Sequence, residues 1–180
     1  MTDRSEASKL LKLGIITAFA TLSFVGTTVI RVPIPATGGY FNLGDTFVML
    51  AGLLYGPVAG ALVGLIGPTV ADAVGFPQFM LATAIVKFCE GGVVGLIGGS
   101  SNSQNKIRPI LALAVGIGIL VAGYFIFEAF IYPFLADSIP FFGVTDLKAA
   151  LAEIVPNLLQ GIISAIVAFG IFWLFRRNTF

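Results

Sequence analysis

Long apolar stretches dominate the chain, and short polar or Gly- and Pro-containing segments separate them. A helix needs about 20 mainly apolar residues to cross about 30 Å of hydrocarbon. Windows of this kind predict an all-α membrane protein, a single integral domain over residues 1–180 built as a bundle of six transmembrane helices. The second helix is too short to cross unaided, so we expect it to be tilted or partly re-entrant. The predicted helices cover about residues 10–30, 43–55, 58–74, 79–97, 109–132 and 147–175.

The composition supports a membrane protein and excludes several other classes. Of the 180 residues 57% are apolar and 11% are charged, whereas an average soluble domain carries roughly 25% charged residues. A disordered chain would be poor in apolar residues. A net charge of +1 offers nucleic acid little to bind. The sequence contains no histidine, which removes the commonest general base and transition-metal ligand.

The cations predict the orientation of the bundle. With six helices, both termini lie on the same side as the turn at 56–57 and the polar loop at 100–108. That side carries seven of the ten Lys and Arg residues, namely Arg4, Lys9, Lys12, Lys106, Arg108, Arg176 and Arg177. The positive-inside rule therefore places both termini in the cytoplasm. The first apolar stretch exceeds the 7–15 residues of a signal-peptide core, so we expect it to be retained.

Charged residues inside the predicted helices gather toward one side of the membrane. Each costs roughly 2.5–3.5 kcal/mol on insertion scales. Most lie in the outer half, and the pair on the fourth helix lies near the middle, which describes a polar cavity open to the outside and closed toward the cytoplasm. The six residues are Asp45, Asp72, Lys87, Glu90, Glu128 and Glu153.

Polar residues also recur at helical spacing on the last three predicted helices. Such stripes must face protein or water rather than lipid. They are Lys87 with Glu90, then Tyr124 with Glu128 and Tyr132, then Glu153 with Asn157 and Gln160. Hydrogen bonds between helices would explain any single member, but the whole set on one side favours a ligand site. We expect Asp45 and Asp72 to be structural, because both lie close to interface water or helix ends.

The predicted external loop at 37–45 combines glycines with Tyr40, Phe41 and Asn42. Flexible glycines beside stacking and hydrogen-bonding side chains are typical of a loop that folds over a flat ligand as a lid. The alternative is an ordinary turn into a short helix, capped by Asn42 or Asp45.

Small residues recur at every fourth position on three predicted helices, a spacing that lets helix backbones approach closely in lipid. The runs are Gly14 with Ala18, Gly56 with Gly60 and Gly64, and Gly91 with Gly95 and Gly99. We expect tight packing within the bundle for the last two. The first run fits either internal packing or a docking face for a partner.

The most distinctive segment is 38–45, Gly-Gly-Tyr-Phe-Asn-Leu-Gly-Asp, which continues into 51–57, Ala-Gly-Leu-Leu-Tyr-Gly-Pro. It resembles the core of the substrate-binding S components of energy-coupling factor (ECF) transporters, the vitamin importers of bacteria and archaea. The similarity is to the subgroup for riboflavin, pyridoxine and hydroxymethylpyrimidine. The nickel and cobalt S components differ, because they use an N-terminal metal-binding arm.

The resemblance implies a six-helix S-component fold in the plasma membrane, with a vitamin bound near the external face. In that family an Ala-x-x-x-Ala motif on the first helix contacts the shared ECF transmembrane subunit, and the matching positions here are Gly14 and Ala18. Two cytoplasmic ATPases would supply the energy while the S component topples in the membrane. This chain has no G-x-x-x-x-G-K-[ST] motif of its own, and neither a cofactor nor a metal is expected.

These observations predict a protein that binds a small vitamin and is not an enzyme. The predicted ligand contacts are Tyr40, Phe41, Asn42, Lys87, Glu90, Tyr124, Glu128, Tyr132, Glu153, Asn157 and Gln160. Because charges of both signs are among them, we expect a heteroaromatic ring bearing hydroxyls, with a pyridoxine or hydroxymethylpyrimidine type favoured over riboflavin. One alternative is a proton-coupled secondary transporter that uses Glu128 or Glu153. An intramembrane enzyme is disfavoured, because no nucleophile–base pair or metal constellation is visible.

Overall fold

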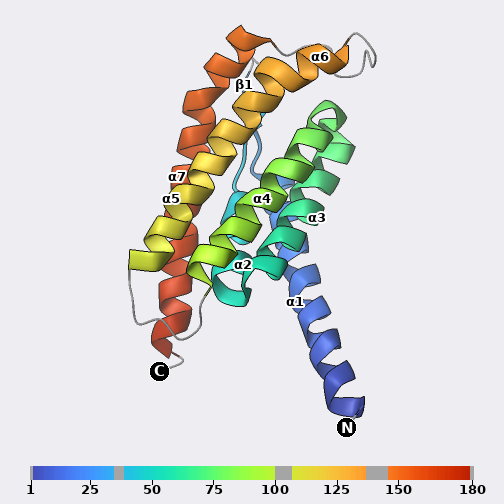
Figure 1. Cartoon of the computed structure of the whole chain (residues 1–180), viewed down its shortest axis with the longest axis vertical. Coiled ribbons are helices and arrows are strands. Elements are labelled where there is room, and N and C mark those ends of the chain that lie inside the picture. Colours follow the sequence, from blue (N-terminus) through green and yellow to red (C-terminus); the bar gives the residue numbers. More distant parts are fainter. Residues whose placement is uncertain (1, 35–38, 100–106, 137–145, 179–180) are drawn as a thin grey trace.

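The computed structural model describes residues 2–34, 39–99, 107–136 and 146–178, and within these ranges it is a helical bundle with one small hairpin (Figure 1). The helices are α1 (Thr2–Val29), α2 (Asp45–Tyr55), α3 (Pro57–Gly75), α4 (Met80–Gly98), α5 (Ile107–Ile126), α6 (Tyr132–Ala136) and α7 (Leu147–Asn178). A 3-10 turn, η1 (Pro77–Phe79), precedes α4, and a π-helical turn, η2 (Phe127–Ile131), joins α5 to α6. The strands are β1 (Val32–Ile34) and β2 (Gly39–Phe41).

The predicted six-helix bundle is confirmed, with α5, η2 and α6 forming one continuous segment. Among the described residues, five helical segments are long and apolar enough to cross a membrane. The first begins at Thr2 rather than near Leu10, because its polar first turns are helical without belonging to the hydrophobic stretch. The last part of the fifth continues to Ala136, beyond the predicted end near Tyr132.

Helix α2 is the short member of the bundle and lies inside it. Its 11 residues span about 16 Å at 1.5 Å per residue, about half of the hydrocarbon thickness. Val48, Met49 and Ala51 are fully buried, and the helix packs against α3, α4 and α7. Its apolar surface therefore faces protein rather than lipid.

Glycines set the closest contacts between helices. Gly56 has a φ of +84° between α2 and α3, a conformation that glycine adopts readily, and Pro57 starts α3. A Cβ atom added to Gly60 on α3 would collide with the Gly91 carbonyl on α4, and one added to Gly91 would collide with the Gly60 carbonyl. The tight packing predicted for these two runs is confirmed. A Cβ atom added to Gly14 on α1 would meet no atom within 4 Å.

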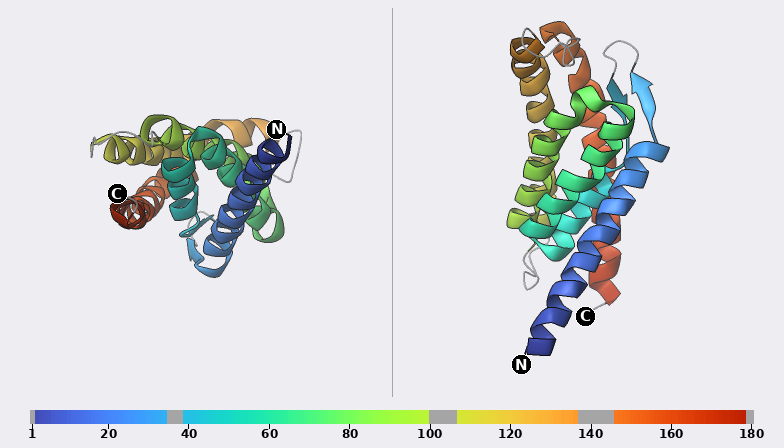
Figure 2. Two further views of the ribbon diagram at one scale, coloured as in Figure 1. Left: turned by 90° about the horizontal axis from the view of Figure 1, so that it is seen from below. Right: turned by 90° about the vertical axis from the view of Figure 1, so that its right-hand side faces the viewer.

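The start of α1 and the end of α7 lie at the same end of the bundle (Figure 1). The first turns of α1 extend away from the other helices there, as the second view in Figure 2 shows, and residues 5–14 are exposed. The last turns of α3 and the first turns of α4 and α7 lie at the opposite end. One end of the bundle therefore carries the start of α1 and the end of α7, and the other carries the turns that connect α3 to α4 and begin α7.

The β hairpin carries part of the predicted external loop into the bundle. Strands β1 and β2 pair antiparallel, with Pro33 opposite Tyr40. The Ser23 hydroxyl of α1 donates a hydrogen bond to the Gly44 carbonyl at 3.0 Å, which fixes the end of the hairpin before α2. Thr37 and Gly38, the start of the predicted lid, lie outside the described residues.

Candidate functional site

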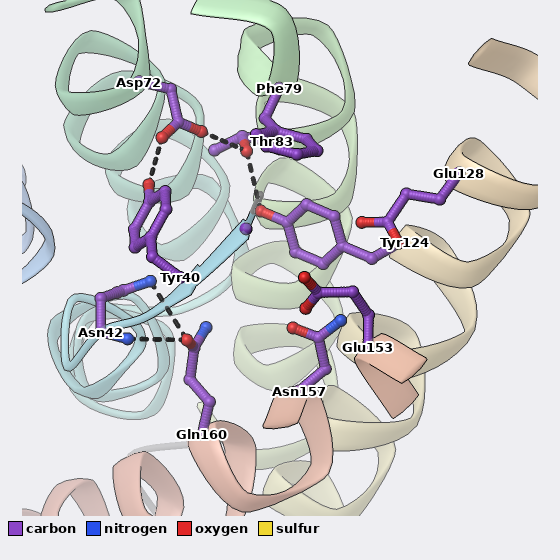
Figure 3. Close-up of a pocket in the computed structure, with 11 residues that line it drawn as sticks. Tyr40, Asn42, Asp72, Phe79, Thr83, Tyr124, Glu128, Glu153, Asn157 and Gln160 are labelled. Atoms are coloured by element: carbon purple, nitrogen blue, oxygen red, sulfur yellow. Dashed lines mark hydrogen bonds between the residues drawn. The ribbon is translucent and has the colours of Figure 1, made fainter. Parts of the chain in front are cut away.

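A cavity lies between the hairpin and the ends of α3, α4, α5 and α7 that point away from the chain termini (Figure 3). Its lining combines aromatic rings with carboxyl, amide and hydroxyl groups. The lining residues are Gly39, Tyr40, Asn42, Asp72, Phe79, Thr83, Tyr124, Glu128, Glu153, Asn157 and Gln160. Seven of the eleven predicted ligand contacts are therefore brought together by four separate elements.

One wall is a chain of hydrogen bonds from β2 through α3 and α4 to α5. The Tyr40 hydroxyl donates to the Asp72 carboxylate, and the Thr83 hydroxyl donates to Asp72 Oδ2 at 2.6 Å. The hydroxyls of Thr83 and Tyr124 are 2.8 Å apart. Because Thr83 has one proton and gives it to Asp72, Tyr124 must donate to Thr83. Burial raises the pKa of the Tyr40 phenol well above its usual value, so this hydroxyl remains a donor.

The opposite wall joins the hairpin to α7 through one amide side chain. Gln160 Oε1 accepts from the Asn42 backbone N–H at 2.8 Å and from Asn42 Nδ2 at 3.2 Å. Its Nε2 donates to Asp45 Oδ2 at 2.8 Å. Asn42 Oδ1 in turn accepts from the Gly44 N–H at 2.8 Å. Gln160 therefore fixes both the hairpin and the first residue of α2 against α7.

Lys87 and Glu90 lie outside the cavity lining, in a buried charge cluster behind Gln160. Lys87 Nζ is 2.5 Å from Asp45 Oδ1 and 2.9 Å from Glu90 Oε2. All three residues are at most 1% exposed. Lys87 Nζ also lies 5.4 Å from the centre of the Tyr124 ring. Lys87 and Glu90 therefore lie behind the residues that line the cavity, and the bond from Gln160 to Asp45 links the cluster to the cavity.

Glu128 and Glu153 form the carboxylate side of the cavity. Figure 3 shows both carboxyl groups pointing into it beside the Tyr124 ring. Both residues are 4% exposed. Glu128 Oε2 has no hydrogen-bond partner among the described residues. An unpartnered buried carboxylate oxygen is costly, so this corner is suited to a ligand that donates.

The π-helical turn explains why Tyr132 does not share the face of Tyr124 and Glu128. The sequence stripe assumed an unbroken α-helix, but a π turn takes more residues per turn and rotates the residues after it. The Tyr132 hydroxyl instead accepts the Ala82 backbone N–H at 3.0 Å. Phe41 is also outside the lining. It lies between Tyr40 and Asn42 on the chain, and successive side chains of a strand point to opposite faces.

Asp72, Gly39, Phe79 and Thr83 line the cavity without having been predicted as contacts. Asp72 was expected to be structural because it is near a helix end. Thr83 had a usable signal, since positions 83, 87 and 90 share one helical face. The other two depend on how the hairpin and η1 meet, which no local pattern encodes.

The cavity is small in this conformation, with a volume of about 30 Å³. A single buried water needs roughly 10–15 Å³ on this measure, whereas ligand pockets usually occupy about 300–1,000 Å³. A vitamin-sized molecule therefore fits only if the walls of the cavity move apart.

Comparison with known proteins identifies relatives over nearly the whole chain. The family model described as "ECF-type riboflavin transporter, S component" matches residues 5–177. An uncharacterized protein in the gap 3' region of Pyrococcus woesei is 30% identical over 154 residues, which are 86% of this chain and 94% of that protein. A solved structure of the S component of a bacterial ECF transporter has a similar fold, with a TM-score of 0.62 and 18% identity over 95% of this chain and 96% of that chain.

Proposed function

The chain belongs to the S-component family of ECF-type riboflavin transporters, and we propose that it captures a small heteroaromatic vitamin at the cell surface for ATP-driven import. The family is one of transport components rather than enzymes, and the chain is a multi-helix membrane protein. In our proposal the whole chain acts as one integral domain of the plasma membrane.

The cavity carries this proposal. It brings the flat rings of Tyr40, Phe79 and Tyr124 together with the amides of Asn157 and Gln160. Ligand pockets commonly combine apolar walls with a few polar groups that fix orientation. A six-membered heteroaromatic ring with hydroxyl or amino substituents can stack on these rings and bond the polar groups. We therefore favour a pyridoxine or hydroxymethylpyrimidine type of ligand, with riboflavin as the second candidate.

The orientation of the bundle supports capture from outside. The start of α1 and the end of α7 lie at the end of the bundle opposite the cavity. The excess of Lys and Arg near this end favours a cytoplasmic location for it by the positive-inside rule. With this orientation the cavity lies toward the external face, where a vitamin would enter it from outside the cell.

The exposed start of α1 supports docking to a partner. Gly14 and Ala18 are both exposed, and nothing would contact a Cβ atom at Gly14 within 4 Å. A small-residue face lets another helix approach closely in the membrane. In our proposal it contacts the ECF transmembrane coupling subunit, which recruits the two cytoplasmic ATPases.

Reconstitution into proteoliposomes tests this function. We expect the purified protein to bind radiolabelled pyridoxine, hydroxymethylpyrimidine or riboflavin, and to accumulate the bound vitamin only with the coupling subunit, the ATPases and ATP. Uptake by the protein alone, driven by a proton gradient and lost in Glu128→Gln or Glu153→Gln, would establish the proton-coupled alternative.

A further inference from the structure

We propose that the ligand carries a positively charged amino group, which the Glu128 and Glu153 carboxyl groups bind while the ring stacks on the neighbouring aromatic side chains. This inference rests on the proposed vitamin-binding function and narrows the class of ligand. It differs from the expectation drawn from the sequence, which counted Lys87 among the ligand contacts and therefore favoured a heteroaromatic ring bearing hydroxyls.

The charged side chains among the described residues that line the cavity are all acidic. Asp72, Glu128 and Glu153 contribute carboxyl groups, and none of the described lining residues is a lysine or an arginine. Charged groups in a membrane-buried, low-dielectric site need compensation by opposite charge or by hydrogen bonds. A cationic ligand would supply both at once.

Two cations beside the site already have other partners. Lys87 pairs with Asp45 and Glu90 behind the cavity. Arg31 bonds the Thr27 carbonyl at 3.3 Å and the Ala71 carbonyl at 3.5 Å. Its guanidinium also lies over the Tyr40 ring, 4.5 Å from the ring centre, on the hairpin side of the site. Neither cation is among the residues that line the cavity.

The three carboxyl groups differ in how well the protein satisfies them. Asp72 accepts hydroxyl bonds from Tyr40 and Thr83. Glu128 Oε2, on a residue 96% buried, has no hydrogen-bond partner among the described residues although it faces the cavity. The carboxylate oxygen that still lacks a donor is therefore on Glu128 rather than on Asp72.

The backbone places Glu128 on the π-helical turn η2. Such turns are rare and occur frequently at functional sites. Tyr124 lies one turn earlier on the same helix, so its ring stands beside the carboxyl group (Figure 3). An aromatic face attracts a cation, and this pairing suits an amino group attached to a flat ring.

A divalent metal fits this corner less well than an amine. Ca²⁺ takes six to eight oxygen ligands, and Mg²⁺ demands near-octahedral geometry. Within the described ranges, no group of three or more His, Cys, Asp or Glu residues could hold a metal ion. Two carboxyl groups, by contrast, match the three donors of one ammonium group.

Calorimetry with matched ligand pairs tests the inference. One pair is pyridoxamine and pyridoxine, and the other is 4-amino-5-aminomethyl-2-methylpyrimidine and its 5-hydroxymethyl counterpart. Within each pair an ammonium replaces a hydroxyl. In at least one pair we expect the amine to bind at least tenfold more tightly. This preference should fall below threefold in Glu128→Gln and in Glu153→Gln, two near-isosteric variants whose folding is checked by size-exclusion chromatography.

The matched control is Glu6→Gln, the same substitution at an exposed residue of α1, which should keep the full preference. Equal or tighter binding of the hydroxyl compound in both pairs, or a preference that survives both cavity substitutions, would overturn the inference. Tighter binding of uncharged riboflavin than of either amine would also overturn it and leave the proposed vitamin capture standing. Failure of all five compounds to bind would refute the capture of these vitamins as well.

Discussion

Replacing Lys87 with methionine removes the positive centre of the buried charge cluster while keeping a long, unbranched side chain. Lys87 is 1% exposed and lies 2.5 Å from Asp45 Oδ1 and 2.9 Å from Glu90 Oε2. The variant leaves two buried carboxylates without a counter-ion, a change that costs about 3–5 kcal/mol. At about 2–4 °C per kcal/mol for a chain of this size, the melting temperature should fall by about 6–20 °C.

Thermal unfolding of the protein in detergent, followed by circular dichroism, measures this loss. Lys9→Met is the matched control, because Lys9 pairs with Glu6 at 2.9 Å in an exposed position where ion pairs contribute little. The triple variant Asp45→Asn, Lys87→Met and Glu90→Gln removes all three charges and keeps an acceptor for Gln160, so most of the lost stability should return.

Ligand affinity separates this account from a direct contact between Lys87 and the ligand. Because the triple variant keeps the Gln160 bond, its affinity for the bound vitamin should stay within about threefold of the original, well under the tenfold that 1.4 kcal/mol represents. The reasoning fails if Lys87→Met has the same melting temperature as the Lys9→Met control. It also fails if the triple variant regains stability but no longer binds.

Three further predictions concern packing, docking and the π-helical turn. Gly91→Ala should destabilise the bundle by about 1–3 kcal/mol or more through overpacking, because its Cβ would meet the Gly60 carbonyl. The control is Gly118→Ala, whose added Cβ would meet no atom within 4 Å. Equal melting temperatures of the two variants would contradict the close packing of α3 and α4. Ala18→Trp should leave vitamin binding unchanged and abolish co-purification with the coupling subunit and ATPases. Normal co-purification would show that this face of α1 does not dock the coupling subunit. Tyr132→Phe should lower the free energy of unfolding by about 1–3 kcal/mol, because the Ala82 N–H loses its acceptor, and ligand affinity should be retained. A large loss of affinity at unchanged stability would show instead that Tyr132 contacts the ligand.

The helices were predictable because the membrane makes hydrophobicity a direct guide to structure. Six apolar segments gave six helices. The short second one was expected to be tilted or partly re-entrant, and its burial inside the bundle as α2 was not predicted. The glycine runs predicted close packing because only small residues admit backbone contact in lipid. The β hairpin was missed, because its three-residue strands carry no periodic signal long enough to detect.

The site was predictable to the extent that polar residues in the membrane need partners. The stripe of Glu153, Asn157 and Gln160 lines the cavity together, because all three residues follow helical spacing within α7. Spacing alone did not distinguish Lys87, which compensates charge behind the wall, from residues on the wall itself. That distinction depends on Asp45, which approaches from another helix, so no pattern within one segment contains it.

Mass spectrometry of the small molecule that co-purifies with the protein from its native membranes is the most direct test of the central claim. The account predicts one heteroaromatic vitamin or close precursor at near-equal molar amount, lost when Glu128→Gln and Glu153→Gln are combined. Recovery of a different class of molecule, such as a lipid, sugar or peptide, in that ratio would contradict capture of a vitamin by this cavity.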